Sequence, residues 1–321
     1  MQYTPIQNIP TRKDIVESHQ LIQHLIHQTP VMSSESLNTM TGCQLYFKCE
    51  NFQKIGAFKM RGAANAAMRL SQQDLKKGLA THSSGNHAQA VARAARELGV
   101  PAYIVMPENA PAVKVAATKD YGAEIVFCES TPEGREAMLK KVVAENKATF
   151  IHPFDNYSVI AGQATAAKEL IEQLDSPLDI LMAPVGGGGL LSGTALAAKY
   201  FSSGTTVIAA EPAKVDDAKR AFISGELEKN ATTDTIADGL RTPICEKTLA
   251  IIRANVSDIL LVEEIAIAHA MKQVWERMKI IIEPSSAVPL AAVFSYPEIF
   301  KNKKIGVILT GGNVDVEHLP F

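Results

Sequence analysis

The sequence predicts an α/β protein with mostly parallel sheets, and three observations lead to this fold class. Short apolar runs of strand length alternate with longer stretches of helical spacing along most of the chain, which is typical of repeated βαβ units. The chain has 321 residues with 46% hydrophobic content, so it can bury the cores of about two domains. Polar and glycine-rich loops follow several expected strands, and ligands of such proteins bind at the carboxyl ends of parallel strands.

The expected elements follow one another without a linker, an internal repeat or a low-complexity tract. Apolar runs and alternation predict strands at 44–49, 78–82, 102–106, 124–128, 149–152, 179–184, 206–211, 258–262, 279–283 and 303–309. Helical spacing predicts helices at 11–28, 63–70, 112–121, 132–146, 159–174 and 263–278, and two more that end near residues 98 and 200. We expect two interwoven open-sheet domains, a small one of residues 78–155 and a large one of residues 1–77 and 156–321.

Composition favours small molecules as partners. The chain has 32 Lys and Arg against 34 Asp and Glu, mixed along its length, so nothing favours nucleic acid or an anionic membrane surface. No secretory signal pattern and no run of about 18 apolar residues is found, so we expect no membrane span. Four scattered cysteines without a CxxC pair indicate buried thiols. A cytoplasmic protein is the resulting expectation.

Lys59 is the first candidate for a chemical role. It follows a turn of small residues within the stretch 52–62, at what the pattern suggests is the start of a helix. An ammonium near the positive end of a helix and in an apolar setting is disfavoured, so its pKa should fall toward the range of a Schiff base or a proton shuttle. A solvated helix lysine is the commoner alternative, so the chemical role depends on other motifs.

Three loops supply those motifs. Four consecutive glycines, 186–189, lie between an expected strand and a helix, where the glycine backbone can wrap a phosphate at the helix N-terminus. The run lacks the ends of a P-loop and the G-x-G-x-x-G spacing, which disfavours a nucleoside triphosphate or NAD; a tight structural turn is the alternative. The polar loop 83–87 also opens a helix and suits an anion. The last expected strand ends in Thr310, Gly311, Gly312 and Asn313.

Along the chain the motifs come in the order reactive lysine, anion loop, phosphate loop and terminal hydroxyl. In this order they resemble the motifs of the fold-type II pyridoxal-phosphate enzymes, which are tryptophan synthase β-like. The resemblance is greatest to the serine racemase and serine/threonine dehydratase family and covers nearly the whole chain. It implies that Lys59 holds the cofactor covalently and later acts as a base, with Phe58 beside it. It also implies a phosphate site of Gly186, Gly187, Gly188 and Gly189, a contact of Asn86 with the ring hydroxyl, a contact of Thr310 with the pyridine nitrogen, and a substrate carboxylate pocket of Ser83, Ser84, Gly85 and His87.

Two features bear on the type of reaction that the resemblance implies. A threonine hydroxyl at position 310 does not keep the pyridine nitrogen protonated as a carboxylate does, which suits β-elimination more than transamination. Ser84 stands where serine racemases have a second base, on the face opposite the lysine, and many threonine dehydratases have alanine. Because inverting a stereocentre needs proton exchange on both faces, Ser84 makes racemisation feasible. Phe154, in contrast, is more similar to the dehydratases.

Further residues concern a metal and the choice of substrate. Glu211, Val215 and Asp217 are similar to the divalent-cation site of the family, with a hard-oxygen set that suits Mg²⁺, Mn²⁺ or Ca²⁺; a solvated acidic loop is the alternative. Arg135 and Arg241 are candidates for binding a second substrate carboxylate, which would favour threo-3-hydroxyaspartate. Each could equally be a surface arginine.

The resemblance therefore implies a pyridoxal-phosphate enzyme that racemises serine and dehydrates serine or threonine to a 2-oxo acid and ammonia. L-threo-3-hydroxyaspartate ammonia-lyase is the near alternative. A non-catalytic sensor of a small ligand is the alternative from another class. A homodimer is the usual assembly among the proteins that the chain resembles.

Overall fold

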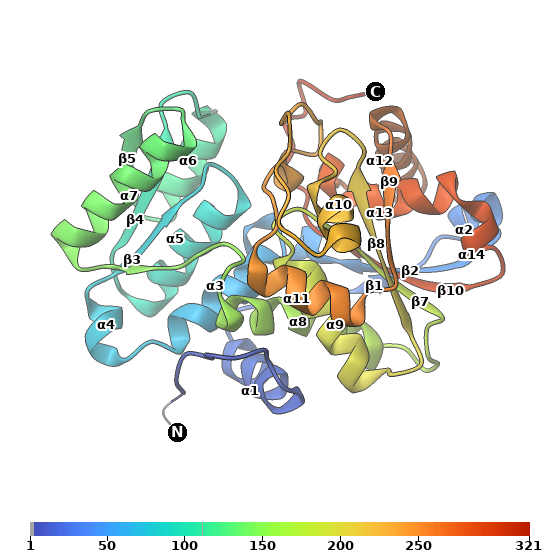
Figure 1. Ribbon diagram of the computed structural model, residues 1–321, viewed down its shortest axis with the longest axis horizontal. Helices are drawn as coiled ribbons and strands as arrows, with labels where there is room; N and C mark the ends of the chain where they lie inside the picture. Colours follow the sequence, from blue (N-terminus) through green and yellow to red (C-terminus); the bar gives the residue numbers. More distant parts are fainter. Residues whose placement is uncertain (1–2, 111) are drawn as a thin grey trace.

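Two separate sheets form the framework of the protein in the computed structural model, which describes residues 3–110 and 112–321. The sheets lie side by side, the smaller on the left of Figure 1 and the larger on the right. All strand pairs but one are parallel among the described residues. The predicted α/β class with mostly parallel strands is therefore confirmed.

The larger sheet has six strands in the order β1-β2-β10-β7-β8-β9. Their bounds are β1 (Val31–Met32), β2 (Gln44–Cys49), β7 (Ile180–Pro184), β8 (Thr206–Pro212), β9 (Asp258–Val262) and β10 (Lys304–Leu309). The central strand β10 pairs in parallel with β2, Val307 opposite Phe47, and with β7, Val307 opposite Met182. Side chains alternate between two buried cores, one on each face of this sheet.

The smaller sheet has four parallel strands in the order β5-β4-β3-β6. Their bounds are β3 (Leu79–His82), β4 (Ala102–Pro107), β5 (Glu124–Cys128) and β6 (Thr149–Phe150). Helix α5 packs on one face of this sheet with α3, and α7 covers β3, β4 and β5 through a separate core cluster.

Helices cover both faces of the larger sheet. Helices α8 and α9 pack against one face, and α13 against the other with α12 outside it (Figure 1). The bounds are α1 (Arg12–Ile22), α2 (Glu35–Thr41), α3 (Lys59–Met68), α4 (Gln72–Lys76), α5 (Asn86–Leu98), α6 (Ala112–Asp120), α7 (Pro132–Asn146), α8 (Tyr157–Glu172), α9 (Gly189–Phe201), α10 (Asp217–Ser224), α11 (Glu246–Asn255), α12 (Glu264–Met278), α13 (Pro284–Ser295) and α14 (Pro297–Phe300). Three short 3₁₀ turns are η1 (Glu50–Phe52), η2 (Lys54–Gly56) and η3 (Asp238–Leu240).

The structure corrects several expected elements. Residues 279–283 form no strand: the segment is unpaired and leads from α12 into α13. The helix expected at 63–70 begins at Lys59, and the leading helix ends at Ile22 rather than at residue 28. Sequence patterns do not predict helices α2, α10, α11 and α13. Helix α13 is buried on nearly all sides, so its apolar residues show no helical period.

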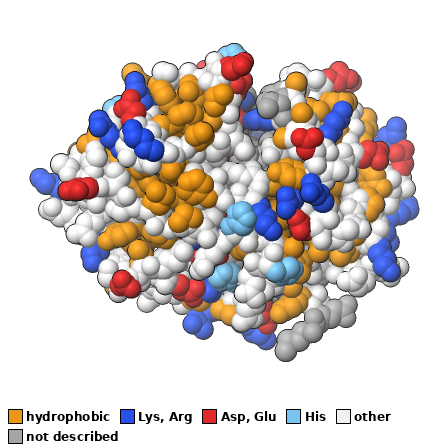
Figure 2. Space-filling model, turned by 180° about the vertical axis from the view of Figure 1, so that it is seen from behind, with side chains coloured by type: hydrophobic (Ala, Val, Ile, Leu, Met, Phe, Trp, Pro, Cys, Tyr) orange, Lys and Arg blue, Asp and Glu red, His pale blue; other side chains and the backbone are white. Residues whose placement is uncertain are grey.

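The chain leaves the larger sheet after β2 and returns to it at β7, so the strands of the smaller sheet come from one continuous stretch between them. This agrees with the expected interweaving, while the domain limits at residues 78 and 155 stay a prediction. Figure 2 shows the face opposite to that of Figure 1, where charges of both signs are intermixed and hydrophobic side chains gather over the half with the larger sheet. No helix within residues 3–110 and 112–321 combines the length and the apolar character needed to span a membrane.

Candidate active site

Lys59 is the first residue of α3, on the side of the larger sheet that faces the smaller one. Its Nζ donates to the backbone carbonyl of Pro153 at 3.4 Å and lies 5.1 Å from the centre of the Phe58 ring. Burial lowers the pKa of Lys59 to about 8, against the opposing effect of the Glu283 carboxylate. A substantial neutral fraction near pH 8 is what a nucleophilic or proton-transferring lysine needs. The expected lowering of the pKa therefore has a structural cause.

Thr310 lies directly after β10, beside the residues that precede Lys59. Its carbonyl accepts from the Phe58 N–H at 2.9 Å, and Ala57 forms a bridge with Gly311. The buried Thr310 hydroxyl is 2.9 Å from the Ser286 hydroxyl, which donates to the Gly311 carbonyl at 2.7 Å. Because a hydroxyl has a single proton, Ser286 accepts from Thr310 here, and the Thr310 hydroxyl can turn to donate the same proton to a pyridine nitrogen instead.

Asn86 is held from two sides at the start of α5. Its Nδ2 donates to both oxygens of Glu283 at 2.9 and 3.1 Å, and its Oδ1 accepts from Asn313 Nδ2 at 2.8 Å. Asn313 also donates to the Ile55 carbonyl at 2.7 Å. These contacts join the smaller sheet to the segments around Lys59 and Thr310. Asn86, Lys59 and Thr310 are thus brought together from three distant parts of the chain.

The glycine run follows β7 and leads into α9, with Gly188 as the N-cap and Gly189 as the first helical residue. Gly188 has a φ of 82°, which favours glycine, and a Cβ there would lie 2.8 Å from Thr248 Cβ. A Cβ at Gly187 would collide with the ring of Phe154. Phe154 directly follows Pro153, whose carbonyl accepts from Lys59. The glycine run and Lys59 therefore contact neighbouring residues of the same segment. The bare backbone at the start of a helix fits the phosphate of pyridoxal phosphate.

The loop 83–85 connects β3 to α5 and carries Ser84. The Gly85 N–H donates to the Ser83 hydroxyl at 3.2 Å, and Gly85 supplies no side-chain cap to α5. His87 is buried and its Nε2 donates to the Ile151 carbonyl at 2.9 Å. Burial, with the Lys59 charge as the next cause, lowers the pKa of His87 to about 3. His87 is therefore neutral, and an anion here depends on backbone N–H groups at the helix start.

Arg135 and Arg241 occupy different positions relative to this loop. Arg135 lies in the first turn of α7, where its charge contributes, after burial, to lowering the pKa of His82. The His82 ring packs 5.7 Å from Phe150 and 6.5 Å from His152, and His152 packs 4.7 Å from Phe154. This aromatic series runs from His82 to Phe154, which borders the glycine run, while the Arg135 Nε donates to the Thr131 carbonyl at 3.3 Å. Arg241 is exposed, and its Nη2 donates to the Thr235 carbonyl at 2.8 Å.

The three residues expected to bind a cation lie where β8 leads into α10. Glu211 is fully buried, and its two oxygens accept from the N–H groups of Ala218 and Lys219 at 3.0 and 2.9 Å. Asp217 is also buried and accepts from the Ile244 N–H at 3.0 Å. Burial, opposed by the two amide contacts and reinforced by the Asp217 charge, raises the pKa of Glu211 to about 9.

Within residues 3–110 and 112–321, no group of three or more His, Cys, Asp or Glu side chains is placed to hold a metal. Two buried carboxylates, Glu211 and Asp217, are close enough for the charge of one to act on the other, and Val215 lies two residues before Asp217 in the chain. Each carboxylate oxygen has about two lone-pair sites, so the amide contacts leave Glu211 able to bind a cation as well. The donor types therefore fit a divalent cation.

Sequence reasoning missed Glu283 and Ser286, which hold Asn86 and Thr310 in place. Both lie at the start of α13, in the motif Glu-Pro-Ser-Ser. A Glu directly before Pro, at the start of an apolar helix, is an available signal for this position. The apolar run before Glu283 indicates the end of a strand instead, and the partner Asn86 is 197 residues away in the chain.

Comparisons with known proteins agree with this geometry. The family profile described as "Pyridoxal-phosphate dependent enzyme" matches residues 22–311. A serine racemase from Dictyostelium discoideum is 49% identical over 315 residues, which cover 96% of this chain and 96% of that protein. A beta-hydroxyaspartate dehydratase from Paracoccus denitrificans (strain Pd 1222) is 47% identical and covers 98% and 99% of the two chains.

Among solved structures, a threonine deaminase from T.th. superposes with a TM-score of 0.91 at 40% identity, over 95% of this chain and 99% of that chain. Profile, relatives and structure thus agree over nearly the full length. The chain therefore belongs to the family of pyridoxal-phosphate dependent enzymes.

Proposed function

We propose that this protein uses pyridoxal phosphate to racemise serine and to dehydrate serine or threonine to the 2-oxo acid and ammonia. The observation that carries the proposal is the convergence of Lys59, of low pKa, with Asn86, Thr310 and the glycine run. The similarity to a serine racemase and to a threonine deaminase supports the choice of reactions.

Each residue has a separate task in this proposal. Bound pyridoxal phosphate supplies an electron sink for the bond electrons left when the substrate α-proton departs. Lys59 holds the cofactor and moves the α-proton on one face, and Ser84 moves it on the other. The glycine run binds the phosphate, Asn86 the ring hydroxyl and Thr310 the pyridine nitrogen. Backbone N–H groups of the loop 83–87 bind the substrate carboxylate.

Replacing Lys59 tests the cofactor role. The purified protein should have an absorbance band at about 410–420 nm when pyridoxal phosphate is bound through Lys59. We expect Lys59→Ala to lose this band, because no other amine at this position can form the covalent link, and to lose both activities. A wild-type protein that is colourless and takes up no pyridoxal phosphate would overturn the enzyme assignment and leave a non-catalytic sensor as the alternative.

Replacing Ser84 separates racemisation from dehydration. Ser84→Ala removes the proton donor and acceptor on one face only, so D-serine formation from L-serine should fall by about 100-fold or more, while pyruvate formation falls by less than about 10-fold. Both products can be measured in one reaction mixture. An equal loss of both would contradict the assignment of two bases.

L-threo-3-hydroxyaspartate ammonia-lyase activity is a second candidate function. Its support is the dehydratase relative, whose name gives β-hydroxyaspartate as its substrate, and the charge of Arg135 near His82. A guanidinium can bind a second carboxylate in a bidentate manner. Comparing serine, threonine and threo-3-hydroxyaspartate side by side, in wild type and Arg135→Met, tests it: only hydroxyaspartate turnover should depend on Arg135. Arg241 is the alternative arginine for the same test.

A divalent cation, Mg²⁺, Mn²⁺ or Ca²⁺, is part of the proposal, with Glu211, Asp217 and Val215 as its oxygen donors. Both carboxyl groups are buried, and a cation bound between them stabilises the folded state by mass action. We expect EDTA to lower the melting temperature by about 5 °C and to lower activity. Glu211→Gln should abolish the response to EDTA. If EDTA changes neither the melting temperature nor the activity of the wild type, Glu211 and Asp217 have a structural role only.

The proposal also includes a homodimer in the cytoplasm. Met40 in α2, Ile281 before α13 and Phe321 after β10 are exposed. Figure 2 shows hydrophobic side chains gathered on the half with the larger sheet, which suits contact with a second copy. Free cysteines suit a reducing compartment. Light scattering should give about twice the 34.6 kDa of one chain, and a monomer mass would contradict the dimer.

A further inference from the structure

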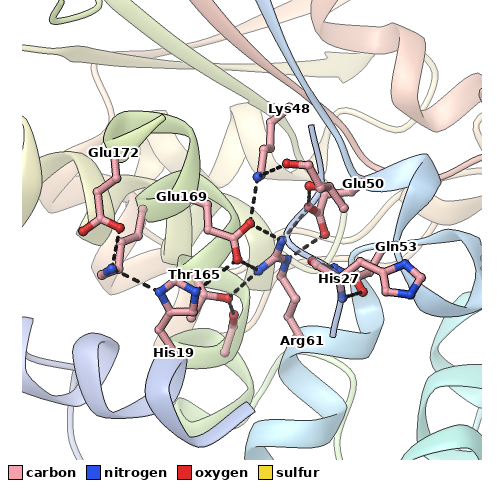
Figure 3. A network of polar contacts seen from close by, with 12 residues as sticks. His19, His27, Lys48, Glu50, Gln53, Arg61, Thr165, Glu169 and Glu172 are labelled. Carbon is pink, nitrogen blue, oxygen red and sulfur yellow. Dashed lines mark hydrogen bonds and ion pairs between the residues drawn. The ribbon is translucent and has the colours of Figure 1, made fainter. Parts of the chain in front are cut away.

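A cluster of buried charges joins α3, which contains Arg61, to η1 and α8 (Figure 3). Arg61 on α3 donates to both oxygens of Glu50 at 2.7 and 2.8 Å and to both oxygens of Glu169 on α8 at 2.8 Å each. Its remaining N–H donates to the Thr165 hydroxyl at 3.1 Å. All five N–H groups of the guanidinium are therefore used. We call Lys48, Glu50, Arg61 and Glu169 the buried charge cluster.

The cluster is complete in charge and in hydrogen bonds. Lys48 on β2 donates to Glu169 at 2.7 Å, to the Thr29 carbonyl at 2.7 Å and to Gln173 at 2.7 Å, so its three N–H groups are used as well. Within the cluster two cations balance two carboxylates, all of them buried, and the partly exposed His19 ring lies 3.1 Å from Glu169 at its edge. Apolar side chains of similar volume often give equal or greater stability than such a buried group of charges. A gain in stability alone therefore does not explain the buried charge cluster. The planar guanidinium of Arg61 forms hydrogen bonds in fixed directions, so it sets the relative positions of the segments that it joins.

The cluster joins the elements that carry three of the four cofactor contacts of the proposed function: Lys59, Thr310 and the glycine run. Lys48 lies opposite Ile308 of β10, the strand that leads to Thr310. Glu169 lies on α8, which packs closely on α9 behind the glycine run: a Cβ at Gly193 would be 2.6 Å from the Ala164 N. Arg61 lies two residues after Lys59. The Arg61 guanidinium thus connects α3, which begins with Lys59, to α8, which packs behind the glycine run. Through Glu169 and Lys48 it also connects α3 to β2, which pairs with the strand that leads to Thr310.

Local structure gives the start of α3 little support of its own. Phe58, in the N-cap position, makes no side-chain cap. The preceding turn contains Ile55 with a φ of 62°, a strained value for a β-branched residue, and Gly56 with a φ of 69°. The Gly62 N–H donates to Gln163 on α8 at 3.1 Å rather than to a cap. The first turn of α3 is therefore held chiefly by tertiary contacts, and those of Arg61 are the most numerous.

We propose that Arg61 is a positioning residue: through the buried charge cluster, it fixes where the Lys59 amine lies relative to Thr310 and the glycine run. This inference rests on the proposed role of Lys59. It assigns Arg61 no contact with substrate or cofactor, and it predicts that loosening Arg61 misplaces the amine even when the protein stays folded.

Arg61→Lys tests the inference, because it keeps the charge and loses the double fork to Glu50 and Glu169. Met271→Ala is the matched control: Met271 is fully buried in α12, outside the buried charge cluster, and its truncation should lower the melting temperature while every contact of Arg61 is kept. The first measurement is the pKa of the Lys59 amine in the cofactor-free full-length chain, from the pH dependence of its acetylation followed by mass spectrometry.

Burial and Glu283 set the pKa of Lys59 at about 8, so a rise in Arg61→Lys would report movement of the amine toward water. We expect a rise of about one unit or more in Arg61→Lys and no change in Met271→Ala. In the holoenzyme, kcat should fall by about 10-fold or more in Arg61→Lys with KM changed by less than about 3-fold, since small misplacements of a reacting group act on the chemical step. Equal pKa and kcat in the two variants would overturn the inference.

Thr165→Val is a second test of the positioning role of Arg61, for the case that Arg61→Lys fails to fold. It removes one of the five contacts without a change of charge or shape, and it should move the pKa of Lys59 and kcat in the same direction by a smaller factor. No movement of either would overturn the inference. The acetylation measurement needs no cofactor, so it decides the positioning role even if Lys59→Ala were to keep the absorbance band and the proposed function were to fail.

Discussion

Glu283 is a buried acid that holds Asn86 in the candidate active site. It is 4% exposed, and both of its oxygens accept from Asn86. Burial, with the nearby Asp238 charge as the second cause, raises the pKa of Glu283 to about 7. The carboxyl group therefore changes charge near neutral pH, directly beside the residue proposed to bind the cofactor hydroxyl and within electrostatic reach of Lys59.

The raised pKa of Glu283 predicts how stability depends on pH. The unfolded chain releases this proton near 4.5, whereas the folded chain keeps it to about 7, so this contribution to stability is full below pH 4.5 and is lost as the pH rises through 7. Glu283→Gln has no such proton. The difference in free energy of unfolding between wild type and Glu283→Gln should fall by roughly 3 kcal/mol from pH 4.5 to 7.5.

Urea unfolding of the two cofactor-free proteins at several pH values measures this difference. Other titrating groups, such as the buried His87 and His152, affect both proteins alike and cancel in the comparison. Two parallel curves would show that Glu283 is ionised in the folded chain throughout this range.

At the scale of elements, the crossing of α3 and α8 sets the position of Lys59. Gly62 and Gly162 meet at this crossing, where a Cβ on Gly162 would lie 2.6 Å from the Arg61 carbonyl and 2.7 Å from Gly62 Cα. The two backbones are therefore as close as glycine allows. Arg61 and Gln163 form hydrogen bonds between the same two helices.

Gly162→Ala is expected to separate these helices. The added methyl group collides with backbone atoms that cannot rotate away, so the free energy of unfolding should fall by about 1–3 kcal/mol, and the absorbance of bound cofactor should weaken. Gly204→Ala is the control, because a Cβ at the exposed Gly204 has no atom within 4 Å. Thermal and urea unfolding measure both variants; similar stabilities of the two would contradict the close crossing.

Local sequence patterns are enough to predict some of the helices and strands. Strands such as β8 and β10 and helices such as α7 are predicted within one or two residues because a run of apolar residues or a change of period is a local property. Residues 279–283 have the composition of a strand, yet they find no partner strand and lead into α13. Pairing depends on the rest of the sheet, which no local window contains.

At the scale of the whole molecule, the two sheets meet through few polar contacts. Asn86 with Glu283 and Asp155 with Lys247 are two of them, and Lys114 with Asp238 is a third. The last two pairs are partly exposed, so each contributes little to stability. The proposed cofactor site lies at this junction, which agrees with the tendency of ligands to bind between lobes of α/β proteins.

The α/β class, most element positions and the loops that carry the proposed chemistry can be predicted from local patterns of residues. Lys59 before a helix, the glycine run and the terminal Thr310 are local patterns, and short-range sterics and helix ends give them their meaning. The resemblance to a known family rests on the order of these same patterns.

The side chains that hold those loops in place are defined by contacts between segments far apart in the chain. Arg61 meets Glu169 across 108 residues and Asn86 meets Glu283 across 197, and each is an ordinary charged or polar residue in the sequence. Burial and partnership set the low pKa of Lys59 and the raised pKa of Glu283, and both depend on every segment packed around the group. Contacts between distant segments have no local signature, which is why the support of the lysine became visible only in the fold.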